Sequence, residues 1–326
     1  MNNRVCKALG IRYPVVQGAM AWNSMPELVA AVSNAGGLGV LGSGPMPADI
    51  ALENIEKIRA LTDKPFGVNV FLDAGPMLEE KAEKLSKANI PVIYIDTLNI
   101  LQRDFTKKYY DIFKQGGSRI LAKINCLEDA LVAEACGADA IICKGLEGGG
   151  HKSKIAAGIL LTEVAQHIKN TPLLVSGGIA APSQMAGYVL MGAEGIEMGT
   201  AFIATEESPV HPNYKTGIVA ACDIDAVYLG DCTGEASWQV RNEKAKRLDA
   251  IEANNVRSVA AELFKKEAAG SGRIAAQTGD TQINGSIMCG ATVALVNSIS
   301  TVDERVRGMC EQCEALLRRS ATLGLG

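Results

Sequence analysis

Short hydrophobic segments recur along the chain, and each is followed by a longer segment with helical periodicity. The short segments are almost continuously apolar, which is typical of strands buried on both faces. Helical periodicity lies between them, for example over residues 25–35, 51–61, 78–88 and 127–136. The pattern predicts eight strands, over residues 13–17, 37–41, 66–71, 91–96, 119–124, 139–144, 172–176 and 195–199.

Strands that alternate with helices at this spacing predict an α/β fold with a parallel sheet, and eight such units predict a closed (β/α)₈ barrel. The alternative is an open, doubly wound sheet. We favour the barrel because no Gly-x-Gly-x-x-Gly motif opens the first helix. Glycine-rich turns instead follow several different strands, at the end where a barrel keeps its active site.

The pattern changes after residue 199. Residues 205–285 are mainly helical in character and predict a small helical lid inserted after the eighth strand. A last helix over residues 301–320 predicts that the C-terminal segment, residues 286–326, returns to the barrel. The barrel itself is therefore expected to comprise residues 1–204.

Composition excludes several classes of function. A net charge of −4 and a pI of about 5.6 give no basic surface for nucleic acid. No apolar segment is long enough to span a membrane and no secretory leader is evident, so we expect a cytoplasmic protein without a membrane partner. Nine scattered cysteines do not form a disulfide framework, and we interpret the isolated Cys310-x-x-Cys313 pair as structural.

Two glycine motifs predict a phosphate site. Ser176-Gly177-Gly178 and Met198-Gly199-Thr200 end the seventh and eighth predicted strands. In a barrel, the loops after these two strands form the usual phosphate site, where glycine lets backbone N–H groups approach the oxygens.

A third motif predicts the catalytic residue. Three glycines after the sixth strand, including Gly149, lead directly to His151. The glycines allow the chain to lie against a flat ligand, and an imidazole at the mouth of a barrel can exchange a proton near neutral pH.

Residues after the first and third strands predict contacts to the polar edge of a flat heterocycle. The amides of Gln17 and Asn69 are expected to point into the barrel mouth, and Met20 to pack on the ring beside Gly18 and Ala19. Metal catalysis is not expected, because the three histidines lie far apart without ligand-like spacing. No nucleophile elbow or P-loop is present.

These segments resemble the nitronate monooxygenase/enoyl-ACP reductase II family of FMN-dependent barrels. The resemblance is carried by residues 14–20, 35–39, 64–69, 147–151 and 177–179, and it extends into the lid at 211–215, 223–225 and 284–290. The stretch at 211–215 and the length are more similar to the enoyl-ACP reductase branch. The resemblance therefore implies FMN as cofactor, NADH or NADPH as reductant, and an enoyl thioester of acyl-carrier protein, or a small enoyl compound, as substrate.

Carried over residue by residue, the resemblance assigns His151 as the catalytic histidine. Asn69, Gly149, Gly178, Gly199 and Thr200 match positions that contact flavin or phosphate. A homodimer is a fair expectation for such barrels.

The sequence also departs from the family. Lys144 stands where relatives usually have Glu or Gln, and it either places positive charge at the flavin edge or turns to solvent. Lys123 adds a second unexpected charge facing the mouth, Ala291 replaces a usual Gln, and residues 94–100 replace a glycine-rich loop.

The alternatives to an enoyl-ACP reductase are a nitronate monooxygenase, an ene-reductase with another substrate, or a flavin-free barrel that binds a phosphorylated metabolite.

Overall fold

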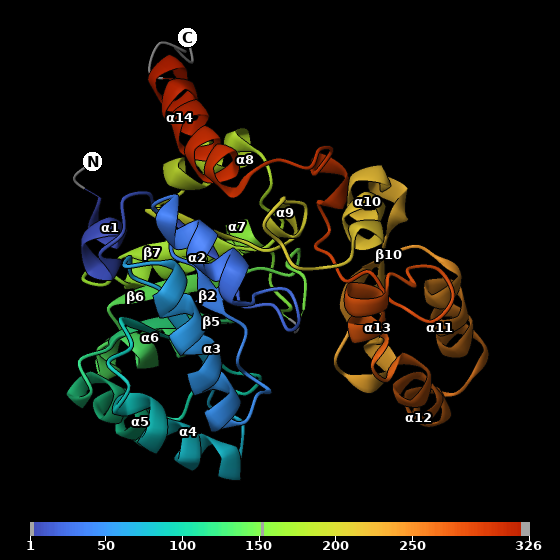
Figure 1. Cartoon of the computed structure of the whole chain (residues 1–326), viewed down its shortest axis with the longest axis horizontal. Helices are drawn as coiled ribbons and strands as arrows, with labels where there is room; N and C mark the ends of the chain where they lie inside the picture. The colour runs from blue at the N-terminus through green and yellow to red at the C-terminus, as the bar shows by residue number, and fades with distance from the viewer. Residues whose placement is uncertain (1–2, 151–152, 321–326) are drawn as a thin grey trace.

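The protein is an eight-stranded parallel barrel with a separate lobe beside it (Figure 1). The computed structural model describes residues 3–150 and 153–320. The sheet order β1-β8-β7-β6-β5-β4-β3-β2 is closed by a parallel bridge between Val16 and Leu38. The predicted (β/α)₈ barrel is confirmed, and its strands are β1 (Val15–Gln17), β2 (Val40–Leu41), β3 (Gly67–Phe71), β4 (Val92–Asp96), β5 (Arg119–Ile124), β6 (Ala140–Lys144), β7 (Leu173–Ser176) and β8 (Gly195–Met198).

Alternate residues of each strand face the interior of the barrel. On β6, for example, Ala140 and Ile142 belong to the interior cluster that also contains Val92 of β4 and Leu174 of β7. Residues of helix α1 (Arg4–Leu9) pack on the same cluster and plug that end of the barrel. The other end, where the strands finish, carries polar and charged side chains instead.

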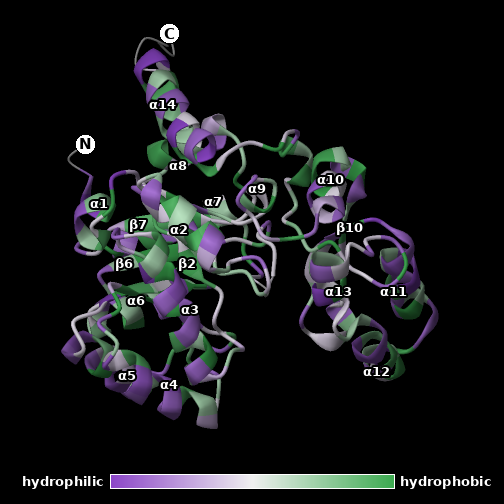
Figure 2. Cartoon of the chain, in the orientation of Figure 1, coloured by the Kyte–Doolittle hydropathy of each residue, from purple (hydrophilic) through white to green (hydrophobic). Residues whose placement is uncertain are grey.

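Amphipathic helices surround the strands and bury their apolar faces against them, whereas their outer faces are hydrophilic (Figure 2). The start of a helix is often marked in the sequence, as where Pro26 occupies the first turn of the helix after β1. These helices are α2 (Pro26–Asn34), α3 (Ala48–Leu61), α4 (Pro76–Ser86), α5 (Arg103–Gln115), α6 (Leu127–Cys136), α7 (Ala157–His167), α8 (Pro182–Leu190) and α9 (Thr200–Ile203).

The lobe after β8 contains the expected helices and, in addition, a β-hairpin. Its helices are α10 (Pro212–Ala220), α11 (Glu243–Asn254), α12 (Arg257–Ala268) and α13 (Ser271–Thr278). The hairpin pairs β9 (Ala226–Leu229) with β10 (Ser237–Val240) in antiparallel register. The sequence did not predict it, because two four-residue strands separated by a polar turn carry too little periodicity.

The C-terminal helix α14 (Val302–Ser320) packs against α8 and α2 of the barrel. Cys310 and Cys313 are buried on the face of this helix that packs against the barrel, and both are free thiols. Within the described residues no group of three or more His, Cys, Asp or Glu side chains is arranged to hold a metal ion. None of the described helices is both long and apolar enough to cross a membrane.

Candidate active site

A cavity of about 810 Å³ lies between the carboxyl ends of the barrel strands and the helical lobe. It is walled by the loops that follow β1, β2, β6, β7 and β8, by the end of β3 and by residues of α12 and α13. Thirteen of the predicted cofactor-binding residues line it: Gly18, Ala19, Met20, Asn69, Lys123, Lys144, Gly149, Ser176, Gly177, Gly178, Met198, Gly199 and Thr200. Segments that are 180 residues apart in the sequence are therefore brought together at one site.

Gln17 lies elsewhere, and its expected orientation is wrong. Its side chain is completely buried between β1 and β2, outside the cavity wall. The amide oxygen accepts a hydrogen bond from Val40 N at 3.1 Å, and the amide nitrogen donates to Ser24 Oγ at 2.7 Å. Since β1 and β2 are joined mainly through a single bridge, the side chain of Gln17 supplies the hydrogen bonding that a longer ladder would provide.

The predicted catalytic residue His151 lies outside the described residues. The three glycines before it are described, and Gly148, Gly149 and Gly150 all line the cavity. A side chain at Gly149 would have its Cβ only 2.5 Å from the carbonyl oxygen of Cys289, so the loop after β6 runs directly against the segment that follows the lobe. Glycine is required at position 149 by this close approach, and Gly150 has a φ of 74°, which favours glycine.

The glycine loops after β7 and β8 form one side of the cavity. Gly178 has a φ of 69°, in the left-handed region that glycine alone adopts without strain. Its carbonyl accepts a hydrogen bond from Gln184 Nε2 at 2.5 Å, which ties the loop to α8. Thr200 Oγ1 accepts from Gly290 N at 2.9 Å, which leaves the hydroxyl hydrogen available for a ligand.

Charged side chains form the floor of the cavity. Lys123 Nζ lies 3.0 Å from Asp96 Oδ2 and 4.0 Å from Glu197 Oε1, and all three side chains are buried. Glu197 also accepts hydrogen bonds from Ser176 Oγ at 2.6 Å and from the Tyr94 hydroxyl. The predicted charge of Lys123 thus faces the mouth, but as part of an ion-pair network.

Lys144 also lines the cavity and is 4% exposed, so it is not turned to bulk solvent. Burial and, secondarily, the ammonium group of Lys123 lower the pKa of Lys144 to about 7, and the carboxylates of Asp96 and Glu197 oppose this only in part. Burial also lowers the pKa of Lys123, but Asp96 and Glu197 more than compensate and raise it overall. The two lysines therefore differ: Lys123 is a permanent cation, whereas Lys144 titrates near neutral pH.

The lobe is fixed to the barrel on both sides of the cavity. Trp238 Nε1 of β10 donates to the carbonyl of Leu146, in the loop after β6, at 2.9 Å. Across the cavity, the guanidinium of Arg273 in α13 lies 5.7 Å from the ring centroid of Trp22, in the loop after β1. The lobe thus covers the barrel mouth, as a lid would.

Sequence reasoning missed Asp96 and Glu197 as site residues, although both line the cavity. A signal was present, because each is a charged residue inside an otherwise apolar strand, at an inward-facing position. The lid residues Arg273 and Lys265 were missed for a different reason. Their helices carry no motif, and only the tertiary fold brings them to the cavity.

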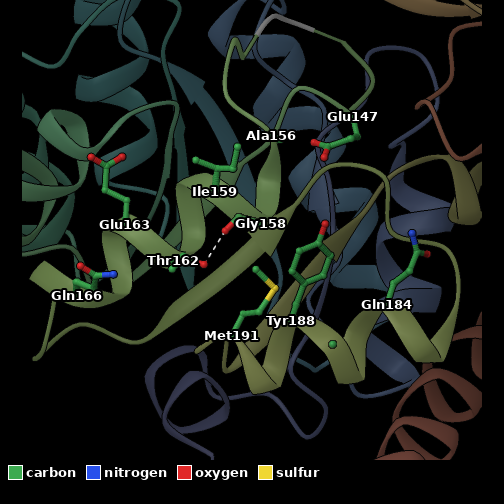
Figure 3. Close-up of a pocket in the computed structure, with 11 residues that line it drawn as sticks. Glu147, Ala156, Gly158, Ile159, Thr162, Glu163, Gln166, Gln184, Tyr188 and Met191 are labelled. Atoms are coloured by element: carbon green, nitrogen blue, oxygen red, sulfur yellow. Dashed lines mark hydrogen bonds between the residues drawn. The ribbon is translucent and has the colours of Figure 1, made fainter.

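A second hollow, of about 870 Å³, lies on the outside of the barrel between α7 and α8 (Figure 3). Its walls include Ile159, Tyr188 and Met191, and the carboxylate of Glu147 at its edge accepts a hydrogen bond from Ala157 N at 3.0 Å, which caps α7. Among the described residues that line it, no two titratable side chains are buried together. We therefore place the chemistry in the central cavity.

The central cavity fits a flavin mononucleotide. Backbone at Gly178 and Gly199 and the Thr200 hydroxyl suit the phosphate, the Asn69 amide suits the polar edge of the ring, and the lysines suit negative charge on that edge. Asn69 is held at the wall through its Nδ2, which donates to the Tyr94 carbonyl at 3.4 Å.

Comparison with known proteins agrees with this geometry. A family model described as nitronate monooxygenase matches residues 2–312. The structure of FabK from Thermotoga maritima is 32% identical and superimposes with a TM-score of 0.89 over 98% of this chain and 99% of that one. A nitroalkane oxidase from Streptomyces ansochromogenes is 25% identical, with a TM-score of 0.80 over 98% of this chain and 100% of that one.

Two relatives known from their sequences extend this picture. A probable nitronate monooxygenase of Staphylococcus saprophyticus is 28% identical over 83% of this chain and 89% of its own length. A Mycobacterium tuberculosis relative, (3aS,4S,5R,7aS)-5-hydroxy-7a-methyl-1-oxo-octahydro-1H-indene-4-carboxyl-CoA dehydrogenase, is 32% identical over 77% of this chain and 69% of its own.

Proposed function

This chain belongs to the nitronate monooxygenase family, whose members are flavin-dependent oxidoreductases, and from that premise we propose that it binds FMN and uses NAD(P)H to reduce an activated C=C bond. The default substrate is a trans-2-enoyl thioester of acyl-carrier protein. The proposal includes a cytoplasmic setting and a homodimer.

The observation that carries the proposal is the similarity to FabK, an enoyl-ACP reductase, across both barrel and lid. The Mycobacterium relative supports the same class of substrate, because its name specifies a carboxyl-CoA, which is a thioester. Both are 32% identical to this chain, whereas the nitronate-type proteins named above are 25% and 28% identical.

FMN, when bound, supplies a ring position that accepts a hydride and passes it on. The chain's own residues bind and orient: Gly178, Gly199 and Thr200 would hold the phosphate, and Asn69 the polar edge of the ring. The apolar side chains of Ile203 in α9, Phe264 in α12 and Met288 also line the cavity and suit an acyl chain.

Proton transfer is assigned to His151 on the sequence resemblance. Its imidazole would donate a hydrogen bond to the thioester carbonyl, which stabilises negative charge on that oxygen, and assist protonation of the α-carbon. We expect His151→Ala to retain FMN, because the phosphate contacts hold the cofactor, and to turn over at least about 100-fold more slowly. Normal turnover by this variant would show that His151 is not the catalytic residue.

The second candidate is a nitronate monooxygenase, which uses O₂ and needs no nicotinamide. The family description and the name of the Staphylococcus relative favour it. In that activity His151 would act as a general base or orient the nitronate.

Anaerobic mixing with NADH and with NADPH separates the two candidates. Rapid bleaching of the flavin band near 450 nm, reversed by a crotonyl thioester, is the result expected for the reductase. Bleaching by an alkyl nitronate but by neither nicotinamide would assign the protein to the monooxygenase. A purified protein without a flavin band would contradict both and favour the phosphate-binding alternative.

A further inference from the structure

Four strand ends, those of β4, β5, β6 and β8, place ionisable side chains on the floor of the cavity. Asp96 ends β4, Lys123 lies near the end of β5, Lys144 ends β6 and Glu197 lies near the end of β8. All four line the cavity, and each is less than 10% exposed. Two lysines and two carboxyl groups buried this deeply are expensive to desolvate unless they contact one another.

Lys123, Asp96 and Glu197 make short contacts within the cluster and with neighbouring groups. Lys123 lies within 4.0 Å of both carboxylates. Glu197 accepts two hydroxyl hydrogen bonds, from Ser176 and Tyr94, and Asp96 Oδ1 accepts from Thr97 N at 3.0 Å.

Lys144 occupies a different position in the cluster. A Cβ built on Gly148 would lie 3.3 Å from Lys144 Cε, so the lysine side chain runs beneath the glycine loop that walls the cavity. The charges that act on it are Lys123, which opposes its protonation, and Asp96 and Glu197, which favour it. Tyr94, the remaining titratable group of the cluster, stays protonated because burial and the two carboxylates raise its pKa.

We propose that Lys144 is the proton-accepting partner of the bound flavin: its amine takes up one proton from solvent when the flavin gains negative charge, and releases it when that charge leaves. The proposal deepens the proposed function and rests on it for the cofactor alone. Lys144 is suited to this role because its side chain lines the cavity beneath the Gly148 loop. Burial and the ammonium group of Lys123 also lower the pKa of its amine to about 7. A negative ligand in the cavity would then favour the ammonium form.

The balance of atoms and electrons is simple. A hydride, which carries two electrons and one proton, passes from NAD(P)H to the flavin and adds one negative charge to it. Lys144–NH₂ binds one proton from solvent and becomes Lys144–NH₃⁺, so the net charge of the site does not change. Reoxidation by the substrate reverses the charge, and the proton leaves Lys144 for the solvent or the product.

The test counts protons per two electrons from the pH dependence of the flavin midpoint potential in the holoprotein. Potentials are measured by equilibration with a reference dye during slow enzymatic reduction, without nicotinamide or substrate. Between pH 7.5 and 9 we expect two protons per two electrons in the wild type, one on the flavin and one on Lys144. Lys144→Arg, a permanent cation, and Lys144→Met, a neutral side chain, are each expected to give one.

Lys81 provides a matched control. It is buried in α4, donates to the carbonyls of Ser43 and Gly44 at 2.7 and 2.5 Å, and has a pKa lowered to about 8 by burial, but it does not line the cavity. Lys81→Arg should keep the two-proton count. Two protons in both Lys144 variants, or one in the wild type, would overturn the proposal. Because no nicotinamide or thioester is used, failure of the reductase assignment leaves this count unaffected.

Discussion

Two parts of the cavity wall, the glycine loops after β7 and β8 and the charged floor from β4, β5, β6 and β8, are built on different principles. The loops present backbone groups to the cavity, and the sequence pattern that predicts them is local, because it consists of a few consecutive residues such as Ser176-Gly177-Gly178. The floor presents charged side chains to the cavity, and these come from strands that are distant in the sequence, as for Asp96 and Glu197. Local motifs therefore identify where a ligand binds, whereas the tertiary fold decides the electrostatic environment in which it reacts.

The two parts of the wall also differ in their energetic cost to folding. A glycine at a φ of 69° avoids strain at Gly178. The floor instead holds charges away from water, and it is stable only because each charge has partners. Substitutions should therefore have the largest effect where they leave a charge without its partner.

Glu197→Leu should have the largest effect. It removes a carboxylate that accepts from Ser176 and Tyr94 and lies 4.0 Å from Lys123. We expect the free energy of unfolding to fall by about 3–5 kcal/mol, because breaking a buried network leaves an uncompensated charge. Denaturant titration followed by circular dichroism measures it.

Glu163→Leu is the matched control, since Glu163 lies exposed on the outside of α7. Its free energy of unfolding should change by less than about 0.5 kcal/mol. Equal losses in the two variants would mean that the floor does not contribute to stability through its charges.

Gly178→Val probes the other part of the wall. The variant forces a β-branched residue into the left-handed region, and its Cβ would lie 2.8 Å from Glu147 Cβ and 3.2 Å from Thr292 Cγ2. Strain and crowding of about 3 kcal/mol predict that the dissociation constant for FMN rises about 100-fold. Quenching of FMN fluorescence in titrations of the apoprotein measures this.

Gly187→Ala serves as the control, because Gly187 lies in α8 and a Cβ there meets nothing within 4 Å. FMN should bind this variant as it binds the wild type. If Gly178→Val also bound FMN normally, the loop after β7 would not hold the phosphate.

The barrel was predicted correctly from the sequence, and all of the predicted cofactor-binding residues except Gln17 line the cavity. Both predictions depend on short-range signals. Eight apolar segments are enough to place eight strands, and glycine after a strand end indicates backbone that approaches a ligand. Gln17 shows the limit: its hydrogen-bond partner Val40 N lies 23 residues away, and no local pattern reports that contact. Glu197 shows another limit, because its inward orientation follows from the register of β8 against β7 and β1.

Lys144→Met tests the charged floor in the opposite direction from Glu197→Leu. Because the pKa of Lys144 is lowered to about 7 in the folded protein, the unfolded chain binds more protons between pH 7 and about 10. Lys144 therefore contributes a gain in stability as pH rises from 7 to 9, and this contribution should be absent in the variant. We expect the stability difference, variant minus wild type, to be about 2 kcal/mol larger at pH 7 than at pH 9.

Unfolding of the oxidised holoprotein at both pH values gives this difference, and Lys81→Arg reports how much of any change comes from replacing a buried lysine elsewhere. A difference that does not depend on pH would mean that Lys144 keeps its proton throughout this range.

Trp238→Phe should have the smallest effect on stability. It tests the contribution of the lid independently of the glycine loops and the charged floor. The indole Nε1 donates to the carbonyl of Leu146 at 2.9 Å, and the ring packs against Tyr228 with centroids 5.0 Å apart. Phenylalanine keeps most of the packing and loses the hydrogen bond, so about 1 kcal/mol of lid docking should be lost. Because the contact fixes the lid to the loop after β6, we expect faster amide hydrogen exchange in β9, β10 and that loop, with little change in FMN affinity. Unchanged exchange in these segments would show that the lid is held by its other contacts, such as that of Arg273 with Trp22, and that Trp238 serves mainly to pack the hairpin.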